Sequence, residues 1–596
     1  MSKLQTPYGG SNRKLLIALD IGTTCSAVSY TILDPGEIPE IRRVPTFPGL
    51  NGSRADAKLP SVLYYNAKGD VQAVGYEAED AFETGKAEDE DWIRVEWFKL
   101  HLRPRGLSDP HIQDESIPPI PENKTVTEVL ADFLRYLFEC AKRYITTTYT
   151  GGDEVLKLFE GGTEFVMGHP NGWGGFQQQN MRQAAVKAGL VPSMDAAGDR
   201  IQFVTEGEAS LYYCLTDTST SDHIKPGNRI MIVDAGGGTV DLSSYLIKQV
   251  GPIKLEEVAS PSCRLQGSVF VDDRAKSYIR EKLRGSSYDD PEDINLIARR
   301  FGETGKRSFE SVDQVVIIPF GGTRDNQPKY GIIKGKLKLQ GDEVHPFFNP
   351  SIEAILDAIR DQRREGGDIK TVFFVGGFST NRYLFDTLRA RLAAIGIDAS
   401  RPDGYTNKAV ADGAVAFYTE NVVTVRFARV AYGTRGIRTY DRTNQEHRAR
   451  THAVIRSATG IENLPNAFHC ILPKGSRVVH DREHVETFAF EVKDKNSLRD
   501  SDITLVTYSG CSPEPRWTDV DSASYRELGR IRAPVSQNSH LLQLVDDGKG
   551  RQFYRFIFRV VLKLGLTELK ACIAWTENGQ EKRSPISIVY VRPEVD

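Results

Sequence analysis

The feature that most constrains this chain is a pattern of acid, glycine and threonine that occurs twice, 214 residues apart. The first copy is Asp20-Ile21-Gly22-Thr23-Thr24, and the second is Asp234-Ala235-Gly236-Gly237-Gly238-Thr239-Val240-Asp241. Each copy lies between two apolar, β-rich runs, which predicts a strand, a tight turn and a second strand. The repetition predicts a duplicated lobe, with one such turn in each half of the α/β region.

Both turns have the residue types of a phosphate site. Glycines let backbone N–H groups converge on phosphate oxygens, and threonine hydroxyls donate further hydrogen bonds. Because carboxylates cannot bind phosphate directly, we expect Asp20 and Asp234 to hold Mg²⁺ through its water shell. Either turn alone is more commonly a plain hairpin, but the two together favour phosphates held from both sides. A Walker A loop is absent, and the turns precede strands rather than helices, which excludes a Rossmann fingerprint.

Charge and apolar patterning exclude several other classes. The 596 residues carry 76 basic and 80 acidic side chains, so there is no electrostatic case for binding nucleic acid or an anionic membrane. The apolar run 15–19 ends at Asp20 and is too short for a secretory signal, and no apolar stretch approaches the ~20 residues of a membrane span. The seven cysteines form no C-x-x-C pair, which favours a reducing compartment. We therefore expect a cytoplasmic or nuclear protein.

The chain divides into three parts by pattern. Residues 1–14 are polar and are expected to form a flexible tail. Residues 15–423 alternate strands with helices, including an amphipathic helix over 126–144 and a strand that passes through Gly376-Gly377 into a helix over 381–393. Residues 424–596 are rich in β-branched and aromatic runs separated by turn signals, which predicts a mainly antiparallel β domain.

Further motifs give the chain a clear resemblance. Together with the two phosphate turns, it resembles the heat-shock-seventy chaperones, within the actin-like ATPase superfamily. Thr205-Glu206-Gly207-Glu208-Ala209-Ser210-Leu211-Tyr212 resembles the family's first connecting helix, and Ala409-Val410-Ala411-Asp412-Gly413-Ala414 its second connecting segment. Val375-Gly376-Gly377-Phe378-Ser379 resembles the adenosine motif.

The resemblance implies that ATP is bound with Mg²⁺ and hydrolysed slowly to ADP and phosphate. In the family pattern, Thr23 and Thr239 hold γ-phosphate oxygens and Lys99 neutralises charge. Glu206 joins Asp20 and Asp234 in organising the waters of the metal, and Asp241 orients the attacking water. Glu303, Lys306 and Arg307 have the spacing of the helix that grips adenine and ribose. The remaining expected nucleotide contacts are Gly22, Thr24, Gly236, Gly237, Gly238, Gly376, Gly377 and Phe378.

The fold implied is a bilobed, actin-like α/β domain with duplicated lobes over 15–423, followed by a mainly β domain that resembles a peptide-binding sandwich. The sequence stops at Asp596, so we expect no helical lid, and the chain resembles the divergent, lid-less members of the family. Unfolded or apolar peptides and co-chaperones are the implied partners, and peptides should exchange rapidly without a lid.

Three positions depart from the family pattern and leave alternatives open. Thr380 stands where the family has an adenine-stacking arginine, Glu310 replaces a serine near the adenine, and Asn407 replaces the acid that opens the second connecting segment. These changes favour a scaffold that senses nucleotide without hydrolysing it. The shared phosphate turns also allow a small-molecule kinase of the same superfamily, although such an enzyme would have little use for the C-terminal β region.

Overall fold

The protein is described by a computed structural model that falls into two compact units, Met1–Val423 and Thr424–Asp596. The described residues are 6–50, 58–104, 117–159, 161–404, 406–420, 422–457, 459–479, 482–495, 499–533, 535–546, 550–564 and 569–584. Among them, no helix has the length and apolar character needed to cross a bilayer. The first unit is mixed α/β and the second is mainly β.

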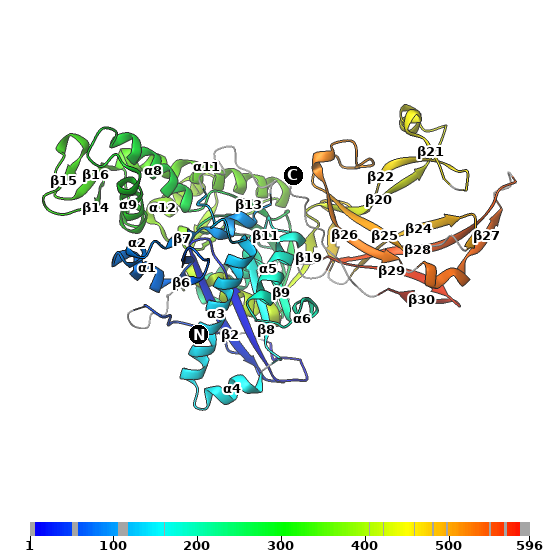
Figure 1. The fold of residues 1–596 in the computed structure, drawn as a ribbon, viewed down its shortest axis with the longest axis horizontal. Coiled ribbons are helices and arrows are strands. Elements are labelled where there is room, and N and C mark those ends of the chain that lie inside the picture. Colours follow the sequence, from blue (N-terminus) through cyan, green and yellow to red (C-terminus); the bar gives the residue numbers. More distant parts are fainter. Residues whose placement is uncertain are drawn as a thin grey trace. The chain divides into compact units, whose positions relative to one another are not determined.

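The first sheet of the α/β unit carries the first turn. Its strand order is β3-β2-β1-β8-β9, with β4 paired to β2, where β3 covers Arg42–Arg43 and β4 covers Leu59–Pro60. The hairpin β1 (Lys14–Asp20) and β2 (Cys25–Leu33) is antiparallel, whereas β8 (Glu164–His169) and β9 (Ile201–Thr205) continue the sheet in parallel (Figure 1). Nearly every residue of β1 is buried, as expected for an interior strand covered on both faces. The helix α3 (Val126–Thr148) contributes the buried residues Phe133 and Leu137 to the core of this sheet.

A second sheet repeats this arrangement around the second turn. Here β10 (Arg229–Ala235) and β11 (Val240–Gln249) form the antiparallel hairpin, and β17 (Thr371–Val375) and β18 (Asp398–Ser400) extend it in parallel beyond β10. On its other edge β11 pairs with β12 (Lys254–Glu257) and β13 (Ser262–Arg264). The helices α8 (Val269–Lys282), α11 (Gly341–Gly366) and α12 (Arg382–Ala393) supply much of its apolar core.

Two helices pack closely together beside these sheets. The helix α7 (Glu206–Thr216) begins with Thr205 as its N-cap, and α13 (Ala409–Glu420) approaches it so closely that a Cβ at Gly413 would collide with the carbonyl of Ala209. The hydroxyl of Tyr212 on α7 accepts a hydrogen bond of 2.8 Å from the Val422 amide, and the Val422 carbonyl accepts one of 2.9 Å from the Leu255 amide. The last residues of the first unit are therefore tied to α7 and β12.

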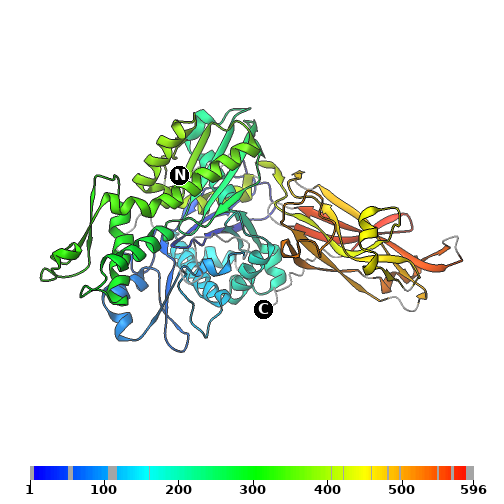
Figure 2. The same cartoon turned by 90° about the horizontal axis from the view of Figure 1, so that it is seen from above.

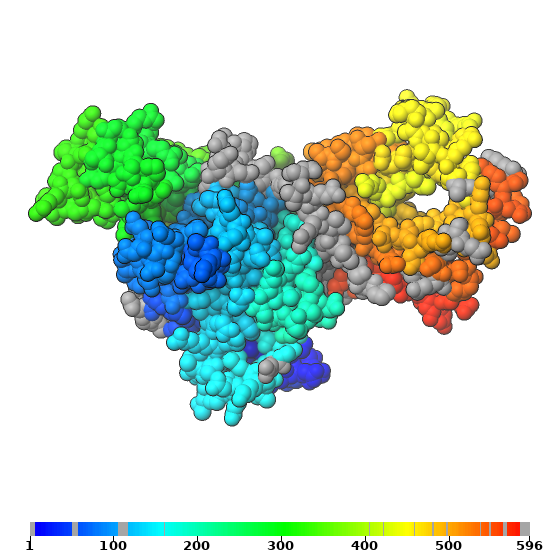
Figure 3. Space-filling model, in the orientation of Figure 1, coloured from blue at the N-terminus to red at the C-terminus, as the bar shows by residue number. Residues whose placement is uncertain are grey.

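Two smaller elements lie side by side although they are far apart in sequence. One is the sheet β6-β5-β7, formed by Val71–Val74, Val62–Tyr65 and Ile93–Glu96, with the helix α1 (Tyr76–Glu83). The other contains α9 (Pro291–Arg300) and the sheet β14-β16-β15, formed by Val315–Pro319, Lys336–Gln340 and Ile332–Ile333. Figure 3 shows their surfaces adjoining, α1 in blue and the α9 region in green.

The second unit consists of two antiparallel sheets that enclose an apolar core (Figure 2). One has the order β21-β22-β20-β25-β26, and the other has the order β24-β28-β29-β30 with β27 paired to β28. The strands run over Ile455–Arg456, Glu462–Leu472, Ala431–Thr439, Ser501–Tyr508 and Tyr525–Ala533 in the first sheet, and over Glu483–Val492, Gln552–Leu564, Leu569–Glu577, Gln580–Arg583 and Gln543–Asp546 in the second. Leu505 and Ile531 of one sheet and Val560 and Ile573 of the other lie in the shared core.

The described part of the N-terminal segment contacts the first unit. The Tyr8 amide donates a hydrogen bond of 2.8 Å to the Glu37 carbonyl, and the Thr6 amide donates one of 3.0 Å to the Glu420 carboxylate. Residues 1–5 of the expected tail lie outside the described residues, as do residues 585–596 at the other end of the chain.

Candidate functional site

The first turn is fixed by contacts within its own hairpin and to the neighbouring strand. The Gly22 amide donates a hydrogen bond of 3.2 Å to the Ser26 hydroxyl, and the Thr24 carbonyl accepts one of 2.9 Å from the Ser61 amide. A Cβ at Gly22 would collide with the Cys25 carbonyl, so this close approach requires glycine. The turn is thus held rigidly at the end of β1.

The second turn is fixed by the start of α8. The Gly236 amide donates a hydrogen bond of 2.9 Å to the Thr239 carbonyl, which closes the turn. The Ser268 and Val269 amides then donate hydrogen bonds of 3.1 and 2.9 Å to the carbonyls of Gly236 and Gly237. Amides at the N-terminus of α8 that lack partners within the helix are satisfied in this way by the turn.

The two turns meet. A Cβ placed on Gly237 would lie 2.6 Å from the Thr24 hydroxyl oxygen, and one placed on Gly238 would collide with the Thr23 hydroxyl. Glycine is therefore needed in the second turn because the first turn packs against it. The structure brings together two segments that the sequence separates by more than 200 residues.

A cavity of about 1590 Å³ opens over this meeting point. That volume exceeds the range of about 300–1,000 Å³ usual for small-molecule sites, so a nucleotide has ample room. Every predicted site residue except Asp241 lines it. The lining includes Asp20, Gly22, Thr23, Thr24, Lys99, Glu206, Asp234, Gly236, Gly237, Gly238, Thr239, Glu303, Lys306, Arg307, Gly376, Gly377 and Phe378.

Four carboxylates gather beneath the turns, and burial disfavours the charge of three of them. The four are Asp20, Glu206, Asp234 and Asp241, and the three are Glu206, Asp234 and Asp241. Burial raises the pKa of Asp234 to about 7, although a hydrogen bond of 2.7 Å from the Ser210 hydroxyl opposes this. Burial also raises the pKa of Glu206 to about 8 against the opposing effect of Lys99, and Asp241 and Asp20 raise it further. A cluster of buried acids favours a bound cation, which would stabilise their charged form.

Asp241 differs from the other acids because it lies behind the cavity wall. It is fully buried, and its Oδ1 accepts a hydrogen bond of 2.6 Å from the Asn171 amide. Its Oδ2 has no hydrogen-bond partner within the described part of the chain. Burial raises the pKa of Asp241, and the Asn171 amide lowers it.

These donors fit Mg²⁺ held through water. Among the described residues, no three histidine, cysteine, aspartate or glutamate side chains are arranged to coordinate a metal directly. Mg²⁺ dehydrates reluctantly and usually keeps several waters, so a cluster of carboxylates that line a cavity suits it without direct coordination. Asp20, Asp234 and Glu206 are the side chains that line the cavity and would hold those waters.

Two lysines neutralise two of these acids. Lys99 lies in a 3-10 helix (Phe98–Leu102), where its buried ammonium is 2.5 Å from Glu206 Oε1 and 5.5 Å from the centre of the Trp173 ring. Lys58, which the sequence analysis did not single out, lies 3.0 Å from Asp20 Oδ2 and also lines the cavity. Lys58 stands next to the two-residue strand β4 (Leu59–Pro60), and no motif marks it.

The predicted adenine and ribose helix is partly engaged in ion pairs. It continues α9 as a π-helical turn (Phe301–Gly305) and a short helix α10 (Lys306–Ser308). Glu303 accepts hydrogen bonds of 2.9 Å from both Arg299 and Arg300, and Lys306 pairs with Asp272 of α8. Arg307 is exposed in the cavity and has no hydrogen-bond or ion-pair partner in the described structure. A ligand could therefore contact Arg307 without displacing another group.

The predicted adenosine motif is joined directly to the second turn. Gly376 follows β17 with φ +85°, and a Cβ there would collide with the Ala235 carbonyl and Asp234. Gly377 has open space beside it, as a ligand contact requires. Of the three departures from the family pattern, Thr380 and Asn407 line the cavity, whereas Glu310 is absent from the lining and pairs with Arg382 at 3.0 Å.

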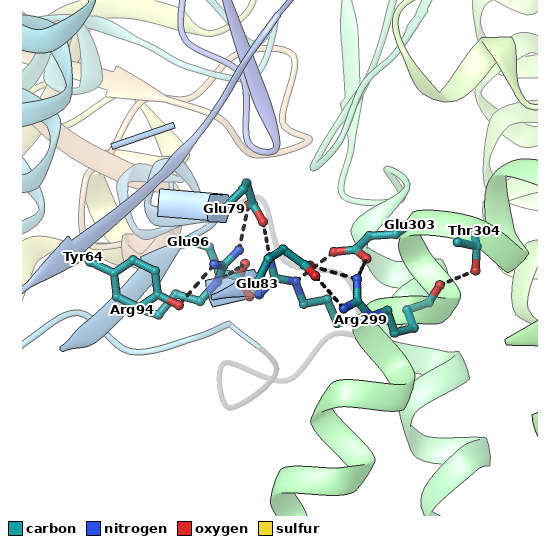
Figure 4. A network of polar contacts seen from close by, with 9 residues as sticks. Tyr64, Glu79, Glu83, Arg94, Glu96, Arg299, Glu303 and Thr304 are labelled. Atoms are coloured by element: carbon teal, nitrogen blue, oxygen red, sulfur yellow. Dashed lines mark hydrogen bonds and ion pairs between the residues drawn. The ribbon is translucent and has the colours of Figure 1, made fainter. Parts of the chain in front are cut away.

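An ionic network that the sequence did not reveal bridges α1 and α9 at the cavity (Figure 4). Arg300 forms two hydrogen bonds of 2.8 Å with Glu83, and Arg299 pairs with Glu79 while its guanidinium lies 3.5 Å from the centre of the Phe82 ring. The same two arginines hold Glu303. The two smaller elements are thus fastened by side chains that also touch the predicted ribose-binding acid.

Comparison with known proteins supports one family. No protein-family model matches the chain. The human protein named heat shock 70 kDa protein 12A is 23% identical over 499 residues, covering 70% of this chain and 71% of that protein, and human heat shock 70 kDa protein 12B is 24% identical over 509 residues, covering 70% and 71%. Chaperone protein DnaK of Buchnera aphidicola is 24% identical over 381 residues, covering 61% of this chain and 53% of that protein.

Fold and site together define a two-unit protein, in which a mixed α/β unit built around a glycine-lined acidic cavity precedes a β unit. The relatives named above narrow this description to one family. The chain is similar to proteins of the heat-shock-seventy family, from which it diverges widely in sequence. The resemblance seen in the sequence motifs is therefore confirmed at the level of the family.

Proposed function

We propose that the chain binds ATP and ADP with Mg²⁺ in this cavity and hydrolyses ATP slowly. The observation that carries the proposal is the contact between two glycine turns from different sheets, with buried acids beneath them. Converging backbone amides suit phosphate, and the acids suit the cation that accompanies it. In this proposal the two sheets are the duplicated lobes of an actin-like ATPase domain.

The residues around the turns have distinct roles in the proposed reaction. The Thr23 and Thr239 hydroxyls hold γ-phosphate oxygens, while the amides of both turns bind the phosphates nearer the nucleoside. Lys99 neutralises charge that builds up on the transferred phosphoryl group, and Mg²⁺ when bound contributes further positive charge to it. Asp241 lies outside the cavity lining, so its proposed part in orienting the attacking water is that of a positioning residue that acts through its neighbours.

The second unit is the proposed partner-binding part. Among the relatives is a protein named a chaperone, and a two-sheet β unit with exposed loops suits the binding of extended peptides. We propose that unfolded or apolar peptides bind there, with co-chaperones as further partners, and that nucleotide state in the first unit changes their affinity. A cytoplasmic or nuclear location is part of the same proposal.

Calorimetric titration with ATP and ADP, followed by single-turnover phosphate release, tests this function. We expect the wild-type protein to bind both nucleotides and to release phosphate slowly. The variant Glu206→Gln should still bind but lose turnover by roughly 10²-fold or more, because it removes the acid paired with Lys99. Absence of nucleotide binding in the folded wild-type protein would overturn the proposal.

A second candidate is a scaffold that responds to nucleotide but does not hydrolyse it. The ion pair of Glu310 with Arg382 favours it, because a residue expected near the adenine is committed elsewhere. The same titration separates the two functions. Tight binding of ATP without phosphate release from the wild-type protein supports the scaffold and contradicts the ATPase.

A further inference from the structure

Lys58 places a second cation at the phosphate end of the cavity, beside the first turn. Its ammonium is 3.0 Å from Asp20 Oδ2, and only 17% of its side chain is exposed. Lys58 also lines the cavity, together with Asp20 and Asp234. An ammonium group has three donors, and the ion pair with Asp20 leaves others free to reach an oxygen in the cavity.

The backbone around Lys58 is held firmly in place. Its carbonyl accepts a hydrogen bond of 2.8 Å from the Tyr76 hydroxyl of α1. The following residues pair with β2, where Leu59 lies opposite Ser26 and Pro60 opposite Cys25. The Ser61 amide is bonded to the Thr24 carbonyl of the first turn, and the Ser61 hydroxyl lies 2.8 Å from that of Ser26. Lys58 is therefore positioned by the same contacts that fix the first turn.

Within the described segments, no lysine is paired with Asp234, the acid of the second turn. The described contact of Asp234 is a hydroxyl, that of Ser210 at 2.7 Å, which carries no charge. Among the described contacts, the acid of the first turn is the one that is ion-paired with a lysine. A water of Mg²⁺ at Asp20 has to share that carboxylate with Lys58.

We propose that Lys58 binds the phosphates of the nucleotide at the first turn and supplies there part of the positive charge that Mg²⁺ would otherwise bring. This inference rests on the proposed function, because it requires that a nucleotide occupy the cavity. Its consequence is nucleotide binding that depends only weakly on Mg²⁺. A phosphate oxygen accepts a charge-assisted hydrogen bond from an ammonium strongly, and the bond needs no metal.

The test is a titration of the full chain with ADP, once with MgCl₂ and once with EDTA. We expect the affinity of the wild-type protein to fall by less than roughly 10-fold when Mg²⁺ is removed. The variant Lys58→Met should lose roughly 10- to 100-fold in affinity in EDTA and less with Mg²⁺, as expected for one lost charge-assisted hydrogen bond. Lys58→Arg, which keeps the charge, should recover part of the affinity in EDTA.

Lys68→Met is the matched control, because Lys68 is exposed in the β5–β6 turn and does not line the cavity. It should bind ADP as the wild-type protein does. The inference is overturned if the wild-type protein needs Mg²⁺ for binding, or if a folded Lys58→Met variant matches it in EDTA. The first result needs no variant, so it decides the matter even if Lys58→Met fails to fold. If ADP does not bind even with Mg²⁺, the proposed function fails instead.

Discussion

The two glycine turns have the same backbone plan but different electrostatic surroundings. Each joins an antiparallel hairpin, and in each an acid lies at or next to the end of the first strand. Asp20 is the last residue of β1 and lies opposite Ala27, and Asp234 is the last but one of β10 and lies opposite Asp241. Asp20 is paired with Lys58, whereas Asp234 has a hydroxyl partner and a pKa raised by burial to about 7. The two turns therefore share a backbone arrangement but not an electrostatic environment, because the segment that packs against each acid is different.

The glycines of the two turns also differ in what they avoid. A side chain at Gly22 would meet the Cys25 carbonyl of its own hairpin, whereas one at Gly237 would meet Thr24 of the other turn. Gly22 is therefore required by the fold of its own hairpin, and Gly237 is required by the contact between the two turns.

The largest expected effect sharpens this difference. Gly237→Val should abolish nucleotide binding, with a loss of roughly 100-fold or more in affinity, because the new side chain forces the turns apart and fills the approach of the phosphates. Calorimetric titration with ATP measures the loss. Gly198→Ala, at an open position of the helix α6 (Met194–Arg200), is the control and should bind normally. Unchanged affinity in Gly237→Val would show that the cradle lies elsewhere.

Removing the two acids should have unequal effects on stability. Asp20→Asn leaves the poorly exposed ammonium of Lys58 without its counter-ion, so we expect the free energy of unfolding to fall by about 2–3 kcal/mol at pH 7. Asp234→Asn removes a carboxylate that burial already disfavours and should change it by about 1 kcal/mol or less. Urea denaturation measures both, and equal losses would break the comparison. Combining Asp20→Asn with Lys58→Met should recover part of the stability.

The pH dependence of the same variants separates the turns again. With a pKa near 7 in the folded protein, Asp234 binds its proton more tightly there than in the unfolded chain. Its contribution favours folding below the ordinary carboxyl pKa and is lost as the pH rises to about 7, with about 2 kcal/mol lost between pH 5 and 7. Asp234→Asn should flatten this part of the profile. A profile as steep as that of the wild-type protein would contradict the assignment.

The smallest expected effect concerns the network that joins α1 to α9. Glu83 and Arg300 are partly exposed, and Arg300 lowers the pKa of Glu83. Glu83→Gln should therefore weaken the contact between α1 and α9 modestly and speed ADP release by about 2- to 5-fold. Stopped-flow release of a fluorescent ADP measures this rate. Glu281→Gln, in an exposed pair with Arg284 outside the cavity, should leave the rate unchanged. Equal rates of ADP release in both variants would show that the ion pairs between α1 and α9 do not slow release.

Local features of the site were predictable from the sequence. The alternation of apolar runs and glycines located both hairpins, because strand period and turn chemistry act within a few residues. Asn381, at the start of the helix expected over 381–393, is the observed N-cap of α12 and accepts a hydrogen bond of 2.9 Å from the Leu384 amide. The helix expected over 126–144 is α3, which continues to Thr148.

Long-range features of the site were not predictable. Lys58 reaches Asp20 only because β4 pairs with β2, and no spacing in the sequence encodes that pairing. The ion pair of Arg299 with Glu79 joins residues 220 positions apart, and both belong to ordinary charged helix faces. The position of Asp241 behind the cavity wall depends on packing against Asn171. Each of these depends on tertiary contacts that propensity and periodicity do not describe.

The hydrogen bond between Tyr212 and the Val422 amide gives α7 a reach beyond the cavity. Glu206, the first residue of this helix, lines the cavity, and Tyr212, further along the same helix, binds the Val422 amide just ahead of Thr424, where the β unit begins. Because an α-helix is stiff, a shift of α7 at one end is accompanied by a shift at the other. We propose that α7 is the segment through which ligand binding in the cavity affects the backbone just ahead of Thr424.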